Sequence, residues 1–275
     1  MSFSVNTNAS AFLALQNLHK TNKDLARVQT RINTGLKVSS AKDDAATYAI
    51  AQTLRGDVAG LGAVSNSLKR AGSSLDVAIA AAEAVSDLLI EMKEKAVAAK
   101  DSGLDTASRQ SLSRDFAQLR DQITSIIENA EFNGVNAVKA NGRDISAITD
   151  PTASKTLNIA AQDLSLGGAN VAISAGQTID TVAFASLAVD QLTAAIDNVN
   201  ASLSTLGAGA KRLEIQQSFV AKLSGTIEVG IGNLVDADLA KEAANLQALQ
   251  VKQQLGLQAL SIANQSPSSI LSLFR

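Results

Sequence analysis

Apolar residues recur at every seventh position along much of the chain. The longest series lies within residues 41–100, where two apolar positions three residues apart continue without a break. A repeat sustained over so many turns predicts one long helix with a coiled-coil seam. The first position holds Leu54, Leu61, Leu68, Leu75, Ala82, Leu89 and Ala96, and the second holds Val64, Ala71, Ala78, Val85, Met92 and Ala99.

Shorter apolar series predict further helices on both sides of this one. A first helix is expected over residues 7–34, and Leu112, Phe116 and Ile123 mark a helix that returns to about Glu128. The heptads resume in the second half and end where Gly225, Gly230 and Gly232 are expected to interrupt the helix. They hold Leu192, Val199, Leu206, Leu213, Val220 and Ile227, partnered by Val189, Ile196, Leu203 and Ala210.

A last helix is expected from Asp236 to just before Pro267, because proline disfavours a helix interior. Its apolar residues lie on more than one face, which predicts neighbours on several sides. Two chain ends that must meet across more than 200 residues are costly to join. We therefore expect the terminal helices to be loose in the free chain and to become ordered against other copies.

The heptads vanish over residues 135–181, where short alternating runs predict a small β-rich excursion. Asn141-Gly142 is a hairpin-turn signal, and residues 156–159 and 171–173 alternate as strands do. Two chain reversals are needed to bring residues 41–130 alongside residues 185–230. The excursion is therefore expected at the far end of the helical rod.

Residues 31–54 carry the signals of a hinge between two helices. Gly35 can adopt the left-handed conformation that ends the first helix. Ser40 and Asp43 have the spacing of a capping box at the start of the second. Asp43 and Asp44 would then both lie in its first turn, where the helix dipole favours negative charge.

The composition restricts the class of protein. Aromatic residues are 3% of the chain and hydrophobic residues 46%, so alanine and leucine must supply the core, as suits closely packed helices. The net charge of −2, without a basic stripe, gives no nucleic-acid footprint. Cysteine is absent, which excludes disulfides and thiol chemistry. The N-terminus is not a secretory signal peptide, and no apolar run has the length of a membrane span.

The sequence offers no catalytic constellation, so we expect neither an enzyme nor a cofactor or metal site. His19 is the single histidine, which excludes a two-histidine metal centre. Paired acids such as Asp43-Asp44 are typical of a helix start rather than of acid–base machinery.

Four motifs in order around the heptads resemble the bacterial flagellins. Residues 31–54 match the family's N-terminal signature in the same order. Phe132-Asn133-Gly134 matches the motif that closes its N-terminal half. Residues 236–240 resemble the family's Asp-Ala-Asp-Phe-Ala, and residues 259–273 match its C-terminal helix and tail. The resemblance covers about residues 1–140 and 186–275. It implies a short, two-domain flagellin of the alpha-proteobacterial type.

This resemblance implies a mainly α fold and a structural role outside the cell. Residues 1–43 with 237–275 would form an inner domain of terminal helices in the filament core. Residues 44–236 would form an antiparallel coiled-coil rod with the β-rich excursion. The chain would leave through the flagellar type III apparatus with an export chaperone on its C-terminal segment, and would meet cap and hook-junction proteins. Its main partner would be itself, in a homopolymer or a mixed-flagellin filament used for motility.

Burial of the terminal helices is expected to drive assembly. Two alternatives remain open at this point, a hook–filament junction protein and a coiled-coil scaffold unrelated to flagella. A scaffold would not explain the terminal motifs. The candidate assembly residues are Leu18, Leu25, Ile32, Leu239, Leu246, Leu255, Leu257 and Leu260.

The resemblance also identifies surface positions. The innate flagellin receptor of animals, toll-like receptor 5, uses an arginine and a leucine of the rod in the family, and this chain has Glu91 and Lys95 there, with Asp115 opposite. Poor activation of that receptor is therefore expected. Related flagellins often carry O-linked sugars on their outer hydroxyls. The corresponding candidates are Thr149, Thr152, Ser154, Thr156, Ser174, Thr178, Thr181 and Ser186.

Overall fold

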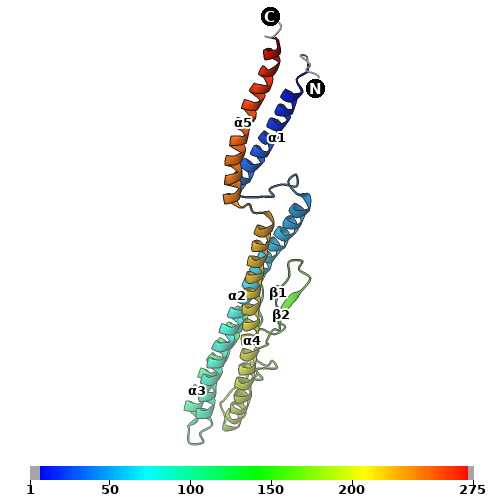
Figure 1. The fold of residues 1–275 in the computed structure, drawn as a ribbon. Helices are drawn as coiled ribbons and strands as arrows, with labels where there is room; N and C mark the ends of the chain where they lie inside the picture. The colour runs from blue at the N-terminus through cyan, green and yellow to red at the C-terminus, as the bar shows by residue number, and fades with distance from the viewer. Residues whose placement is uncertain (1–6, 272–275) are drawn as a thin grey trace. The chain divides into compact units, whose positions relative to one another are not determined.

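The computed structural model describes residues 7–271, which form two compact units (Figure 1). Among the described residues, the terminal-helix unit comprises residues 7–56 with 226–271, and the middle unit comprises Asp57–Gly225. Both units thus draw on both halves of the chain. The elements are α1 (Ala9–Thr34), α2 (Ala45–Ala99), α3 (Thr106–Asn129), β1 (Ile145–Ile148), β2 (Thr156–Ile159), α4 (Val182–Val235) and α5 (Leu239–Leu271).

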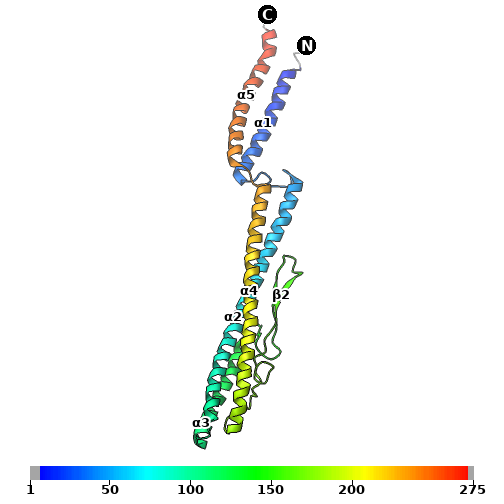
Figure 2. The same ribbon diagram turned by 60° about the horizontal axis from the view of Figure 1, so that its bottom comes forward.

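The seam predicted on the longest helix is buried as expected. Within the middle unit, α2 and α4 run side by side in opposite directions (Figure 2), and Gly72 of α2 lies close to the Gln217 side chain of α4. Leu54 is half-buried, while every other seam residue of α2 is buried. The fold is therefore mainly helical, with long helices from both halves packed together.

On α4 the structure corrects one of the two predicted seam positions. Leu192, Val199 and Leu206 are buried as predicted, whereas the partner position is only half-buried. The fully buried partners lie one residue earlier, and they are small. Small side chains let neighbouring backbones approach, and a search for large apolar residues overlooks them. The predicted set was Val189, Ile196, Leu203 and Ala210, and the buried set is Ala188, Ala195, Ser202 and Gly209.

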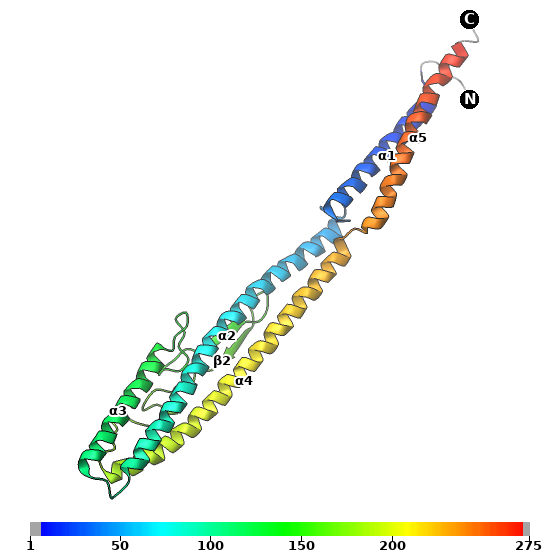
Figure 3. The same ribbon diagram turned by 90° about the vertical axis from the view of Figure 1, so that its left-hand side faces the viewer.

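Helix α3 lies beside α2 in the middle unit (Figure 3). The Asp105 carboxylate caps it by accepting a hydrogen bond from the Ser108 amide at 2.6 Å. The Arg109 guanidinium donates to the carbonyls of Ala99 at 2.9 Å and Asp101 at 2.8 Å, so it caps the end of α2 as well. The turn between the two helices is thus held from both sides. Phe116, Ile123 and Ile127 are buried.

Strands β1 and β2 form an antiparallel hairpin in which Ile145 pairs with Ile159 and Ile148 with Thr156. The hairpin lies along α2 and α4, so the expectation of an excursion at the far end of the rod was wrong. The Ile148 amide donates to the buried Ser67 hydroxyl of α2 at 3.2 Å. The hairpin occupies this position because its inner face, including Ile145 and Ile159, buries apolar surface against the helices.

Two other predictions of local structure need correction within residues 135–181. Residues 171–173 form no strand among the residues described, although Val171 makes a single bridge with Leu166. Val171 and Ile173 are nevertheless buried, because alternation follows the buried face whether or not the backbone pairs. Asn141-Gly142 is a turn, but it precedes β1 instead of joining two strands.

The predicted helix ends at glycine and proline were also wrong. Helix α4 continues through Gly225, Gly230 and Gly232 to Val235. Each glycine costs only about 1 kcal/mol relative to alanine, and burial of Val235 helps to offset that cost. Helix α5 continues past Pro267 to Leu271. A proline removes one helical hydrogen bond, but the chain can remain helical beyond it.

Candidate assembly surfaces

Helices α1 and α5 form an antiparallel pair in the terminal-helix unit (Figure 1). The Asn8 side chain donates to the Ala263 carbonyl at 2.6 Å. The Gln253 amide group donates to the Asn22 side-chain oxygen at 2.7 Å. Both contacts agree with one antiparallel alignment of the two helices to within a few residues, so the register of the pair is defined.

An ion pair between Arg31 and Glu242 lies at the hinge end of the helix pair, with 3.0 Å between Nη1 and Oε1. The Glu242 side chain is 10% exposed and that of Arg31 27% exposed, so water screens the pair only in part. Arg31 lies in the last turn of α1 and Glu242 in the first turn of α5, where the helix dipoles favour these charges. This pair was not predicted from the sequence. Opposite charges at two facing helix ends were the available signal.

The connection between α1 and α2 is hydrogen-bonded to the connection between α4 and α5. Gly35 has φ 70° and ends α1 in the predicted left-handed conformation. The amides of Lys37 and Val38 donate to the Val235 carbonyl at 2.7 and 3.2 Å, and the Ala237 amide donates to Gly35 at 2.9 Å. Val38, Val235 and Ala51 of α2 form a small buried cluster, and these contacts fix where α1 ends and where α5 begins.

The start of α2 differs from the predicted capping box. Asp43 reaches back as expected, and its carboxylate accepts from the amides of Ser39 and Ser40, each at 3.1 Å. The helix nevertheless begins at Ala45, and Asp44 caps it by accepting from the amides of Ala46 and Thr47. Ser40 is therefore not the cap, because its hydroxyl donates to Asp43 instead.

Hydrogen bonds lower the pKa of both aspartates of the hinge. The Ser39 hydroxyl has the largest effect on the pKa of Asp43, and the Thr47 hydroxyl has the largest effect on that of Asp44. The two carboxylates therefore stay ionised at pH values below those at which aspartate is usually protonated.

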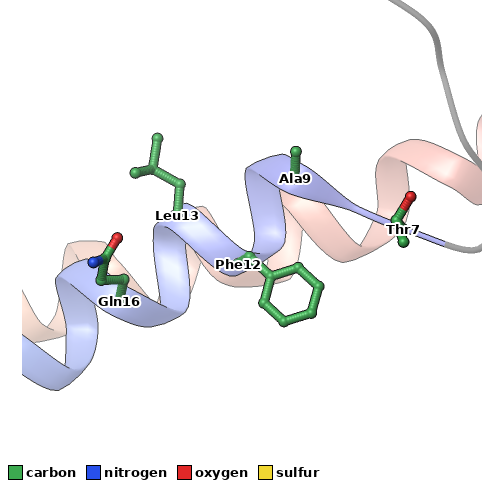
Figure 4. Close-up of a pocket in the computed structure, with 5 residues that line it drawn as sticks. All are labelled: Thr7, Ala9, Phe12, Leu13 and Gln16. Atoms are coloured by element: carbon green, nitrogen blue, oxygen red, sulfur yellow. The ribbon is translucent and has the colours of Figure 1, made fainter.

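Large apolar side chains remain exposed on both terminal helices. Phe12 is 68% exposed and Leu13 59%, and Figure 4 shows them extending to different sides of α1 around a shallow hollow that Thr7 and Gln16 also line. Large apolar residues that stay exposed along both paired helices favour a protein–protein interface here. They comprise Phe12, Leu13, Leu15, Leu239, Val251, Leu255, Leu257 and Ile262, which are 39–69% exposed.

The candidate assembly residues divide into two groups. Leu18 is buried, and a methyl carbon of its side chain lies 3.3 Å from the position a Cβ would take at Gly256, so this residue packs within the helix pair. Leu239, Leu255 and Leu257 are 51–58% exposed and can bury surface only against another molecule. Four candidates are half-buried, namely Leu25, Ile32, Leu246 and Leu260.

Comparison with known proteins decides the family. Residues 5–141 match the bacterial flagellin N-terminal helical region, and residues 189–274 match the bacterial flagellin C-terminal helical region. The chain belongs to the bacterial flagellins. Both halves of the family's helical framework are thus present in this flagellin, on either side of the hairpin.

The similarity to other flagellins extends over the whole length. The chain is 47% identical to flagellin FljM of Caulobacter vibrioides over 272 residues, covering 99% of this chain and 98% of the relative. It is 35% identical to a flagellin of Brucella melitensis, covering 99% of each. A short flagellin of the alpha-proteobacterial type was therefore the correct prediction.

Solved structures support the fold. The crystal structure of Bacillus cereus flagellin has a TM-score of 0.50 at 24% identity, and it covers 56% of this chain and 88% of that one. A putative flagellar hook-associated protein from Vibrio parahaemolyticus has a TM-score of 0.58 at 11% identity, covering 70% of this chain and 100% of that one. At these identities the likeness concerns the fold alone.

Membership of the family establishes the role of this flagellin. It is a structural subunit that polymerises with itself into the extracellular flagellar filament used for motility, and it is not an enzyme. The described part of the chain contains no helical segment with the length and hydropathy of a membrane span.

The other surface positions of this flagellin are accessible to different degrees. Glu91 of α2 and Asp115 of α3 are exposed, and Lys95 is half-buried. Among the candidate glycosylation sites, Thr149 and Ser186 are half-buried, and Ser186 lies inside α4 rather than in the excursion. The exposed hydroxyls are those of Thr152, Ser154, Thr156, Ser174, Thr178 and Thr181.

Proposed function

We propose that this flagellin polymerises through its terminal helices, with residues 1–43 and 237–275 forming the filament core and residues 44–236 the surrounding rod. The observation that carries the proposal is the exposed apolar surface of α1 and α5. Those helices already pair with each other, so the remaining apolar residues have no further partner within the described part of the terminal-helix unit.

The size of the effect supports assembly through this surface. Full burial of one leucine contributes about 1.5–3 kcal/mol, whereas an exposed ion pair contributes about 0–1 kcal/mol. Leu239, Leu255 and Leu257 are 51–58% exposed, so about half of that gain remains for each, and together they can contribute more than any single surface ion pair. Small polar changes elsewhere on α5 are expected to have little effect.

Polymerisation of purified variants tests the proposal. Deletion from Leu239 onward is expected to abolish filaments, as seen by electron microscopy in polymerising salt, while circular dichroism still reports a helical middle unit. The double change Leu255→Ser with Leu257→Ser should raise the critical concentration by at least about tenfold, since partial loss of two buried leucines exceeds 1.4 kcal/mol. Gln254→Ser is the matched control, because this exposed neighbour is already polar. Filaments from the deletion, or a double variant that behaves as the control does, would disprove the proposal.

We also propose that an export chaperone holds the C-terminal segment before the chain leaves through the flagellar type III apparatus. The resemblance to the family supports this, as do the exposed apolar residues of α5, which need cover in the cell. Co-purification from the producing bacterium is expected to recover the chaperone with the full chain and to lose it with the chain truncated before Leu239. Equal recovery with both chains would contradict the assignment.

The outer hydroxyls are proposed to carry any O-linked sugar. Thr156, Ser174 and Thr178 are exposed and do not lie on the buried seams. Intact-mass spectrometry followed by peptide mapping of native filaments should place any added mass on the excursion. Sugars on the heptad helices would count against this.

Weak recognition by the animal receptor is proposed from Glu91, Lys95 and Asp115. Relative to the family, Glu91 reverses a charge and Lys95 replaces an apolar anchor, and each such change costs about 2 kcal/mol or more in an interface. We expect the monomer to activate the receptor poorly and Glu91→Arg with Lys95→Leu to restore much of the signal. Strong activation by the unmodified monomer in a receptor-reporter assay would refute this.

A further inference from the structure

The chain contains two Asn-Gly dipeptides, Asn133-Gly134 and Asn141-Gly142, in the segment that follows α3. Asparagine followed by glycine is the dipeptide most prone to spontaneous loss of side-chain ammonia, because glycine has no side chain to hinder attack by its own backbone nitrogen. Asn133 and Asn141 are both exposed and both have positive φ, 50° and 53°. Their reactivity therefore depends on what holds the glycine amide.

The amide of Gly134 is free to react. The Phe132 amide donates to the Val135 carbonyl at 3.0 Å, and the Val135 amide donates back at 3.0 Å, so Asn133 and Gly134 form the two-residue tip of a tight turn. Within residues 7–271, neither the Asn133 side chain nor the Gly134 amide makes a hydrogen bond. Gly134 is also exposed, and no atom lies within 4 Å of the position that a Cβ would occupy.

The amide of Gly142 is held. It donates to the Lys139 carbonyl at 2.9 Å. A Cβ at Gly142 would lie 2.8 Å from the Asn136 carbonyl oxygen and 2.9 Å from that of Lys139, so this glycine packs tightly against the backbone. Asn136 is itself buried and bonded to the end of α3 through the Ile127 carbonyl at 2.7 Å. The turn at Asn141 therefore rests on a fixed support.

We propose that Asn133 is a site of spontaneous deamidation in the folded chain and that Asn141, with the same dipeptide sequence, is protected. The Gly134 nitrogen gives up its proton and bonds to Cγ of Asn133. The bond from Cγ to the side-chain nitrogen breaks, and that nitrogen leaves as ammonia with the proton. Water then opens the cyclic imide at either carbonyl, giving aspartate or isoaspartate, with no change in oxidation state.

The product would alter the turn chemically and electrostatically. It places a new carboxylate two residues from Glu131, and isoaspartate adds a backbone carbon to a turn whose two hydrogen bonds depend on its length. The affected turn immediately precedes Asn136, which holds the end of α3. Flagellin that has aged would therefore carry aspartate or isoaspartate at position 133, in the turn between α3 and Asn136.

Tryptic mapping distinguishes the two sites, because cleavage after Arg120, Lys139 and Arg143 separates them onto peptides 121–139 and 140–143. The full-length monomer is incubated at mildly alkaline pH and sampled over days, with a time-zero digest to correct for conversion during digestion. Peptide 121–139 is expected to gain about 1 Da, with isoaspartate confirmed by fragmentation. Peptide 140–143 should convert at least about tenfold more slowly, because the Gly142 hydrogen bond must first open.

Two controls keep the outcome decisive. In denaturant the two peptides should convert at comparable rates, because only the fold distinguishes the sites. Asn133→Gln should remove the change from peptide 121–139, since glutamine closes the corresponding ring far more slowly. The proposal is overturned if the folded chain converts both sites equally, if Asn133 stays intact while denatured chain reacts, or if the gained mass persists in Asn133→Gln.

Discussion

Single residues determine how closely the hairpin can approach its helices. A Cβ placed on Gly60 of α2 would lie 2.6 Å from Cβ of Pro151 at the hairpin tip and 3.1 Å from its Cα. No L side chain fits there without moving the tip. Gly62, two residues further along the same helix, has nothing within 4 Å of its Cβ position. Close packing against Pro151 therefore requires a glycine at position 60, whereas no such contact requires one at position 62.

We expect Gly60→Ala to destabilise the middle unit, although alanine favours helix. Displacement of the tip should cost about 1–3 kcal/mol, which exceeds the gain of about 1 kcal/mol in helix propensity. Gly62→Ala is the matched control and should be neutral or stabilising. Urea unfolding followed by circular dichroism measures both variants. A Gly60→Ala chain at least as stable as Gly62→Ala would show that the tip is not held against α2.

At the scale of elements, the hairpin turn is organised by one carboxylate. Asp150 accepts hydrogen bonds from the Thr152 hydroxyl, from the Ser154 hydroxyl at 2.7 Å and from the Lys155 amide at 2.7 Å. The Thr152 hydroxyl has the largest effect, and together these donors hold the pKa of Asp150 well below its ordinary value of 3.8. Because the folded-state pKa is lowered, the contribution to stability is present above 3.8 and is lost as the pH falls further.

Asp150→Asn should therefore loosen the turn at neutral pH and remove its dependence on acid. Exchange of the amides at residues 155–159, followed by NMR, is expected to accelerate in this variant at pH 7 and to differ little from the parent chain at strongly acid pH. Asp76→Asn, which removes an exposed carboxylate of α2, is the control for the change in charge. Unaltered exchange in Asp150→Asn at pH 7 would contradict this role.

The elements also show where sequence reasoning succeeds and where it fails. The α2 seam could be predicted because leucine, valine or methionine recurs between the alanines at its buried positions. The buried side of α4 was misplaced by one residue because Ala195, Ser202 and Gly209 carry no strong apolar signal. The Asp44 cap was missed because Ser40 and Asp43 offered a plausible competing pattern. The Arg31–Glu242 pair requires knowing that residues 211 apart in sequence are neighbours in space.

For the whole molecule, the two units differ in how much of their surface is buried. Leu18, Thr21 and Val28 are the buried residues of α1, whereas the α2 seam is buried continuously from Leu61 to Ala99. Local opening is easiest where few apolar contacts must be broken. The terminal helices should therefore open more readily than the middle unit in the free chain.

Hydrogen exchange of the monomer and of the filament tests this difference. In the monomer, amides of α1 and α5 are expected to exchange at least about a hundredfold faster than those around Leu68 and Leu75 of α2. Filament formation should bring the terminal helices to comparable protection. Terminal helices already as protected in the monomer as the α2 seam would refute the view that they become stable through assembly.

The interleaving of the two chain halves has a consequence for any process that handles the chain from one end. Helix α1 finds its partner in α5, and α2 packs beside α4, so neither unit is complete until residues from both ends are available. A chain threaded through a narrow passage can form isolated helical turns, but it lacks the distant partners that would lock them. For a chain handled in this way, we therefore expect the order of the elements itself to delay stable folding. The two units also differ in timing, because the middle unit needs residues only up to Gly225, whereas α1 must wait for α5 at the opposite end of the chain.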